Sequence, residues 1–133
     1  MFTAETVVRL HHTDAAGVLF FAHQLTLAHD IYEQFMASIG CALSDILTRG
    51  ETLLLIVHTE ADYTAPLHAG DTLTVELRVT ALTEHSFTLG YRFTDTAGKE
   101  VGSVQTVHVA VDKASGQKAP LWPALREALQ AQR

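Results

Sequence analysis

The sequence predicts an α+β fold in which one long helix packs against a curved antiparallel sheet of five strands. The prediction depends on a single long stretch of helical spacing at residues 21–39 and on five strand-like stretches. Short turns join the last four strands, and such turns favour antiparallel neighbours because parallel pairs need long crossovers. A helix with one apolar face must bury it against the sheet. At 133 residues the chain predicts one domain, residues 1–133.

The N-terminal half supplies the first strand and the helices. Residues 3–12 alternate in hydropathy, which predicts a strand, and Gly17 then breaks the pattern. The helix at 21–39 places apolar side chains on one face, and Gly40 is a plausible stop. We expect a short second helix from Ser44, acting as its cap, to Thr48.

The C-terminal half predicts four strands, at residues 53–63, 71–82, 86–94 and 101–111, and a short helix at 124–130. The segment Asp95–Gly98 is typical of a hairpin turn. Residues 53–57 are apolar on both sides of their strand. Self-association would cover such a surface, so we expect an oligomer.

Composition excludes several classes of function. The net charge is −6 and the nine Lys and Arg residues are scattered, which excludes the basic surface that nucleic-acid binding needs. No apolar run approaches the roughly 20 residues of a membrane span. The first residues lack the features of a signal peptide, and Cys41 has no partner for a disulfide. These features predict a cytoplasmic protein with no membrane partner.

The eight histidines do not form a recognisable metal site. His11 and His12 are adjacent on the predicted first strand and would point in opposite directions. His23 and His29 lie six residues apart, which is not the i, i+4 spacing of a helical zinc pair. We therefore expect no metal.

The most informative motif is the stretch from His11 to Val18, directly before the long helix. It places one carboxylate, Asp14, among small residues. The first amides of a helix have no backbone acceptor and favour negative charge. A carboxylate beside such amides suits acyl transfer, because it pairs a base or nucleophile with a stabiliser of the oxyanion.

The motif Thr13–Phe21 and the order of elements resemble the hot-dog-fold acyl-CoA thioesterases of the 4-hydroxybenzoyl-CoA thioesterase type. That family's pattern is an Asp, a small-residue turn with Gly, and two apolar residues that open the central helix. Further segments resemble the 1,4-dihydroxy-2-naphthoyl-CoA hydrolases of menaquinone and phylloquinone biosynthesis. These segments are His23–Leu25, His29–Glu33, Ile56–Tyr63, Ala65–Asp71 and Gln117–Leu121.

The resemblance implies a role for each matching residue. Asp14 would be the nucleophile or general base, and the amide of Phe21 would polarise the thioester carbonyl. No cofactor would be needed, since coenzyme A is part of the substrate. The family also implies a homodimer that assembles to a homotetramer.

Five further residues are candidates for substrate binding. Gly17 would let the backbone approach the ligand, and Phe20 would line an aromatic pocket with Phe21. His23 and Gln24 lie at the helix start beside the expected site, where a purely solvated role is equally open. His58 follows the apolar strand and would bind a substrate oxygen, or would instead be a half-buried histidine bonded to backbone.

The sequence leaves alternatives to an aromatic acyl-CoA thioesterase. One is a thioesterase for short or medium aliphatic acyl-CoA, and another is a non-catalytic module that binds acyl thioesters. His12 stands where many relatives have an acidic or small residue. The turn Leu82–Ser86 lacks the basic residues that benzoyl-type enzymes use for coenzyme A phosphates.

Overall fold

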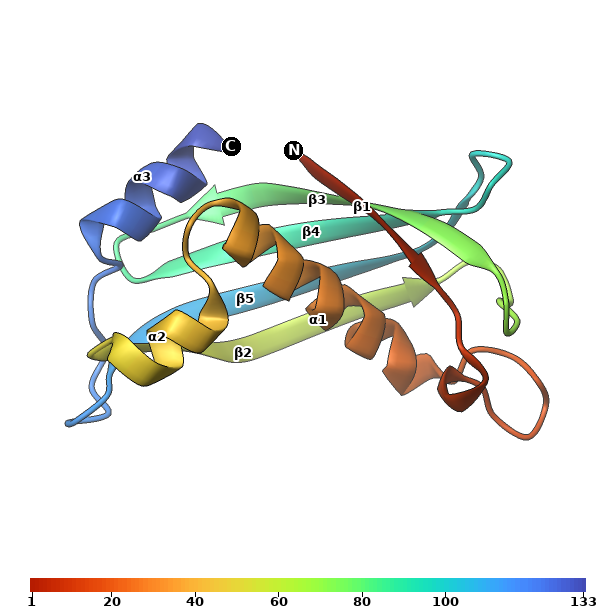
Figure 1. Cartoon of the computed structure of the whole chain (residues 1–133), viewed down its shortest axis with the longest axis horizontal. Coiled ribbons are helices and arrows are strands. Elements are labelled where there is room, and N and C mark those ends of the chain that lie inside the picture. The colour runs from red at the N-terminus through yellow and green to blue at the C-terminus, as the bar shows by residue number, and fades with distance from the viewer.

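The computed structural model describes residues 1–133 as a curved sheet with a long helix across one face (Figure 1). The strands are β1 (Phe2–Val7), β2 (Thr52–Tyr63), β3 (Thr72–Leu82), β4 (Ser86–Thr94) and β5 (Glu100–Asp112). The helices are α1 (Phe21–Ser38), α2 (Leu43–Arg49) and α3 (Pro123–Ala131), and a 3₁₀ turn, η1, spans Leu10–His12. The predicted α+β hot-dog architecture is confirmed.

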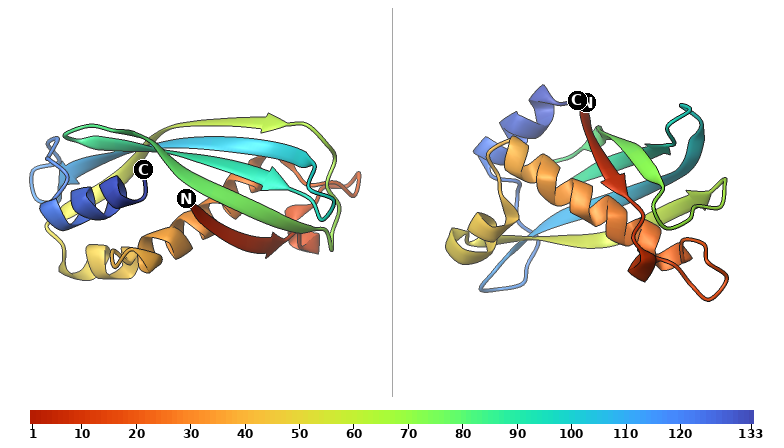
Figure 2. Two further views of the ribbon diagram at one scale, coloured as in Figure 1. Left: turned by 90° about the horizontal axis from the view of Figure 1, so that it is seen from above. Right: turned by 45° about the vertical axis from the view of Figure 1, so that its right-hand side comes forward.

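All neighbouring strands are antiparallel, in the order β1-β3-β4-β5-β2. The predicted hairpin turn at Asp95–Gly98 is present, with Gly98 at a φ of +83° and the Asp95 carboxylate accepting the amide protons of Ala97 and Lys99. The sheet does not close, so β1 and β2 are its edges. Helix α1 covers one face of the sheet, and no element covers the other (Figure 2).

The core lies between α1 and the inward side chains of the sheet. The buried face of α1 consists of Gln24, Leu27, Ala28, Ile31, Tyr32, Phe35 and Met36. It packs against alternate residues of the central strands, namely Leu73, Val75, Leu77 and Val79 of β3 with Phe87, Leu89, Tyr91 and Phe93 of β4. The side chains of Leu125 and Leu129 place α3 in the same cluster. No helix in the structure combines the length and hydropathy needed to cross a membrane.

Two local predictions were wrong. The first strand ends at Val7, because the chain tightens into η1, where the ring Nδ1 of His12 accepts the amide proton of Arg9 at 2.9 Å. His11 and His12 therefore lie on one turn with ring centroids 4.1 Å apart, not on opposite sides of a strand. Helix α2 begins at Leu43 after Ala42, so Ser44 lies inside it and makes no capping bond.

A β-bulge in β2 changes the direction of its side chains. Ile56 pairs with His108 of β5, but His58 pairs with Val107, so Val57 is an extra residue in the ladder. Side chains alternate along a regular strand, and one inserted residue reverses the alternation beyond it. His58 consequently points to the uncovered face of the sheet, and Thr59, opposite Thr106, points toward α1.

Candidate active site

Asp14 lies in a tight turn that precedes α1. Its Oδ1 accepts the amide proton of Ala16 at 2.9 Å, and its backbone carbonyl accepts that of Gly17 at 2.9 Å. Gly17 has a φ of +83°, a conformation that glycine adopts without strain. The turn holds the carboxylate exposed at the tip, with Oδ2 free of hydrogen bonds to protein.

The chain then returns to the start of α1. The amide of Leu19 donates to the carbonyl of Leu67, and that of Phe20 to the carbonyl of His12. Phe21 is the first residue of α1, and its N–H has no acceptor within the protein. A free amide at a helix start carries the positive end of the helix dipole, which favours a negatively charged oxygen.

Asp14 and Phe21 line the same cavity, which has a volume of about 450 Å³. Its walls are mainly apolar and come from three segments of the chain: Asp14 and Val18–Phe21 before and at the start of α1, Gln24 within it, and Tyr63–Leu67 at the end of β2 and directly after it. Phe20 and Phe21 contribute partly exposed rings whose centroids are 4.7 Å apart. The cavity therefore combines an acidic group, a free amide donor and an aromatic wall.

Gln24 joins α1 to the sheet beneath this cavity. Its Nε2 donates to the carbonyls of Asp62 and Ser103 at 2.9 and 3.1 Å, and the residue is 1% exposed. Both amide protons are used in this way, so only Oε1 is left for a ligand. His23 lies outside the cavity lining, with Nδ1 3.2 Å from the hydroxyl of Thr26 and its ring 5.7 Å from that of His12.

His12, whose role the sequence left open, supports the turn. The side chain is buried, and burial followed by the neighbouring His11 lowers the pKa of its imidazole. Its Nδ1 accepts a backbone proton from Arg9, and its carbonyl accepts the amide proton of Phe20. A neutral His12 thus fixes both the entry to the Asp14 turn and the start of α1.

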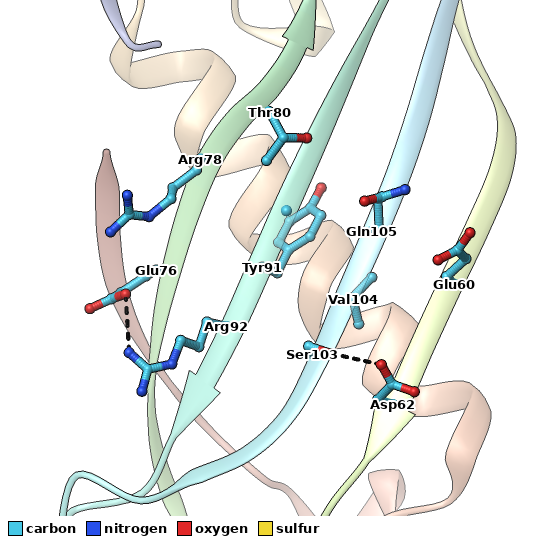
Figure 3. Close-up of a pocket in the computed structure, with 11 residues that line it drawn as sticks. Glu60, Asp62, Glu76, Arg78, Thr80, Tyr91, Arg92, Ser103, Val104 and Gln105 are labelled. Carbon is cyan, nitrogen blue, oxygen red and sulfur yellow. Dashed lines mark hydrogen bonds and ion pairs between the residues drawn. The ribbon is translucent and has the colours of Figure 1, made fainter.

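The structure does not bring His58 to the Asp14 cavity. After the bulge it lies on the uncovered face, where its Nε2 is 2.9 Å from Oε1 of Glu60 and its side chain is 53% exposed. Figure 3 views this face, with Glu60, Asp62, Glu76, Arg78 and Arg92 in front of the sheet and α1 behind it. They line a hollow of about 480 Å³ whose mixed charges do not suit a purely anionic ligand.

Tyr63 is a cavity residue that sequence reasoning left unassigned. Its hydroxyl donates to the carbonyl of Phe21 at 2.9 Å, so the end of β2 contacts the first turn of α1. The segment Asp62–Tyr63 belongs to the stretches that resemble the thioesterases, but the contact joins residues 42 positions apart. Only the tertiary structure reveals it.

The cavity offers no evident site for a metal or for phosphate. The structure contains no group of three His, Cys, Asp or Glu side chains arranged to hold a metal ion. No Lys or Arg lines the Asp14 cavity. Within one protomer the residues that would bind coenzyme A phosphates are therefore not at this cavity.

Comparisons with known proteins show which family the chain resembles. The family model of the thioesterase-like superfamily matches residues 8–129. The 1,4-dihydroxy-2-naphthoyl-CoA hydrolase of Synechococcus elongatus is 38% identical over 127 residues, covering 95% of this chain and 93% of the relative. The enzyme of the same name from Synechocystis is 36% identical, covering 90% and 88%.

Solved structures resemble the fold closely. A crystal structure of a 1,4-dihydroxy-2-naphthoyl-CoA thioesterase from Synechocystis superposes with a TM-score of 0.92 at 34% identity, covering 97% of this chain and 95% of that one. A structure of a putative thioesterase from Prochlorococcus marinus gives a TM-score of 0.91 at 28% identity, covering 98% and 95%.

Proposed function

The chain belongs to the thioesterase-like superfamily and is an acyl-CoA thioesterase, and from that premise we propose that it hydrolyses 1,4-dihydroxy-2-naphthoyl-CoA through Asp14 and the amide of Phe21. The relatives that carry this activity in their names cover nearly the whole chain. The reaction belongs to menaquinone and phylloquinone biosynthesis. Coenzyme A enters as part of the substrate, and no cofactor takes part in the proposed reaction.

The observation that carries the proposal is that one cavity is lined by Asp14 and by Phe21, whose N–H has no acceptor within the protein. Hydrolysis places negative charge on the thioester oxygen as a new C–O bond forms. A preorganised N–H at a helix start stabilises that charge, and the loss of one such donor typically raises the barrier by about 2.7–4 kcal/mol. The Asp14 Oδ2 atom is free to attack the carbonyl carbon or to accept a proton from water.

Two routes are consistent with this arrangement. In the first, the Asp14 carboxylate attacks, coenzyme A leaves as the thiolate, and water then hydrolyses the mixed anhydride. In the second, Asp14 accepts a proton from a water molecule that attacks directly. A single turnover in ¹⁸O-labelled water distinguishes them: attack by water labels the first acid molecule, whereas attack by the Asp14 carboxylate, followed by hydrolysis of the anhydride at the Asp14 carbonyl, leaves that molecule unlabelled and places the label on Asp14.

Asp14→Asn tests the assignment. We expect the variant to fold and to lose at least about a hundredfold in kcat, within the range of general-base or covalent catalysis. Asp95→Asn is a matched control, because Asp95 also begins a four-residue turn that ends in a glycine at a φ of +83° and also accepts an amide proton two residues on. Undiminished hydrolysis by Asp14→Asn would refute the assignment.

The acyl group is tested with a substrate panel. Release of free thiol from 1,4-dihydroxy-2-naphthoyl-CoA is compared with that from benzoyl-CoA, hexanoyl-CoA and decanoyl-CoA. We expect the highest kcat/KM for the naphthoyl thioester. A higher kcat/KM for an aliphatic thioester would favour the alternative of a short- or medium-chain thioesterase, and absence of turnover on all four would favour a binding module.

We also propose a homodimer formed through β2. This edge strand has 12 residues and pairs only with β5, so its outer edge is unpaired. Its centre exposes Leu55, Ile56 and Val57 at 46%, 42% and 59%. A long apolar edge of this kind favours pairing with a second strand. Light scattering on the purified protein at high salt, where only this interface remains, should give twice the monomer mass, and Val57→Lys should shift it to the monomer.

The uncovered sheet face supports the further assembly to a homotetramer. Its acidic side chains Glu60 and Asp62 lie on β2, Glu76 and Arg78 lie on β3, and Arg92 lies on β4. Two copies that meet with a two-fold axis along the strands would oppose Glu60 and Arg78. We expect the tetramer to dissociate to dimers as salt rises, because salt screens exposed charge pairs.

A further inference from the structure

A second cavity lies between α1 and the sheet, farther along the helix than Phe21. It has a volume of about 370 Å³, and its lining includes Leu25 and His29 of α1, Thr59 of β2, Tyr91 of β4 and Thr106 of β5. It shares no lining residue with the Asp14 cavity. The β2 bulge turns Thr59 toward this cavity.

A buried chain of polar groups forms part of the cavity wall. The Tyr91 hydroxyl lies 3.0 Å from Oγ1 of Thr106, which lies 2.7 Å from Nε2 of His108. These residues are 3%, 5% and 0% exposed. The His108 ring is stacked on Phe87, with centroids 4.6 Å apart, and its Nδ1 is buried without a hydrogen-bond partner.

His108 is neutral at ordinary pH, because burial, with a smaller effect from His29, lowers its pKa to about 3. A neutral ring carries one proton, on Nδ1 or Nε2. A proton on Nδ1 would be a buried N–H without an acceptor, which is rarer in proteins than an unpaired acceptor. The proton therefore lies on Nε2 and is donated to Oγ1 of Thr106.

This tautomer leaves one hydroxyl proton unused. With His108 donating to Thr106, the contact between Thr106 and Tyr91 uses the proton of one hydroxyl only. The proton of the other hydroxyl has no acceptor among the three residues. Since Tyr91 and Thr106 both line the cavity, this proton is available to an oxygen atom of a ligand bound there.

We propose that this cavity binds the ring of the aromatic acyl group, and that the Tyr91–Thr106 pair donates a hydrogen bond to the ring oxygen farther from the thioester. The inference rests on the proposed function and adds a determinant of substrate specificity. For 1,4-dihydroxy-2-naphthoyl-CoA this oxygen is the 4-hydroxyl, because the 1-hydroxyl is adjacent to the thioester-bearing carbon and remains beside the carbonyl.

The position of the cavity along α1 fits such a ligand. At about 1.5 Å per residue, Leu25 lies roughly 6 Å and His29 roughly 12 Å along the axis from Phe21. Tyr63, Ala61 and Thr59 form the inward row of β2 beside the same stretch of helix, with Tyr63 bonded to Phe21 and Thr59 in the second cavity. A bicyclic ring whose carbonyl is at the Phe21 amide would extend toward Thr106.

The test compares 1,4-dihydroxy-2-naphthoyl-CoA with 1-hydroxy-2-naphthoyl-CoA, which lacks only the 4-hydroxyl. We expect the wild-type protein to prefer the dihydroxy substrate at least about tenfold in kcat/KM, because a site built to bind a hydroxyl discriminates against its absence. Tyr91→Phe and Thr106→Val should each bring the ratio toward one, mainly by reducing kcat/KM for the dihydroxy substrate. Tyr32→Phe is the control, because Tyr32 is a buried tyrosine whose hydroxyl makes no hydrogen bond.

The outcomes separate this inference from the proposed function. Equal kcat/KM for the two substrates in the wild-type protein would overturn the inference without any variant. So would equal losses on both substrates in Tyr91→Phe and Thr106→Val, since these indicate a structural role only. Absence of turnover on both naphthoyl thioesters would instead refute the proposed function.

Discussion

The hydroxyl of Tyr63 donates a hydrogen bond of 2.9 Å to the carbonyl of Phe21, a residue that lines the Asp14 cavity and whose own amide has no acceptor within the protein. The bond connects the end of β2 to the first turn of α1. It therefore fixes the helix start against the strand that supplies one wall of the cavity. Tyr63 is half exposed, so the bond contributes more to the position of the amide than to stability.

Tyr63→Phe tests this positioning role. We expect kcat to fall about three- to tenfold, since the Phe21 amide loses alignment with the oxyanion, while the melting temperature changes little. Steady-state kinetics and thermal denaturation measure the two effects. An unchanged kcat would show that the bond has no part in aligning the amide.

The close contact between Gly102 and Gln24 leaves no room for a larger residue at position 102. A Cβ at Gly102 would lie 2.9 Å from both amide atoms of Gln24, closer than side chains tolerate. Gly102→Ala would displace Gln24 from the Asp62 and Ser103 carbonyls and should destabilise the fold by about 1–3 kcal/mol. Thermal melts measure the effect, with Ala97→Gly in the exposed Asp95–Gly98 turn as the control. Gly98→Ala is less suitable as a control, because Gly98 has a positive φ that alanine adopts only with strain. Equal melting temperatures for Gly102→Ala and the wild type would contradict this packing argument.

Stability should fall as the pH is lowered from 6.5 toward 3. Burial lowers the pKa of His108 to about 3 and lowers that of His12 from its ordinary 6.5. In this range the unfolded chain binds a proton at His108 that the folded chain excludes, so the free energy of unfolding decreases by up to about 1.4 kcal/mol per pH unit for this group, and the lowered pKa of His12 acts in the same direction. Denaturant titrations at several pH values should show that the free energy of unfolding depends less on pH in His108→Gln than in the wild type. An unchanged pH dependence would exclude His108 as its source.

His58 provides a direct comparison of sequence and structure. Its position after the apolar strand and the chemistry of its ring suggest that it binds substrate, but the bulge at Val57 places it on the uncovered face beside Glu60. We expect His58→Asn to retain kcat/KM within about twofold, the effect of an exposed substitution away from the cavity. A tenfold or greater loss would restore the original hypothesis and would require the side chain to reach a site through oligomer contacts.

The periodicity of the chain was sufficient to predict the architecture. The apolar face of residues 21–39, the alternation in the later strands and the Gly40 and Asp95–Gly98 signals are local properties, and the structure confirms them. The Asp14 motif was also local, because Asp14, Gly17 and Phe21 lie within eight consecutive residues. Its position directly before the helix follows from the sequence alone.

What the tertiary structure decided depends on contacts between distant segments. Three interactions join separate elements, so no local sequence pattern predicts them. They are the Tyr63–Phe21 hydrogen bond, the Gln24–Gly102 contact and the Tyr91–Thr106–His108 chain. The bulge at Val57 reversed the side chains that follow it, because an inserted residue changes which face each one takes. The sequence by itself determined the class of fold and the acidic turn before α1. Packing alone determined which side chains share a cavity with that turn.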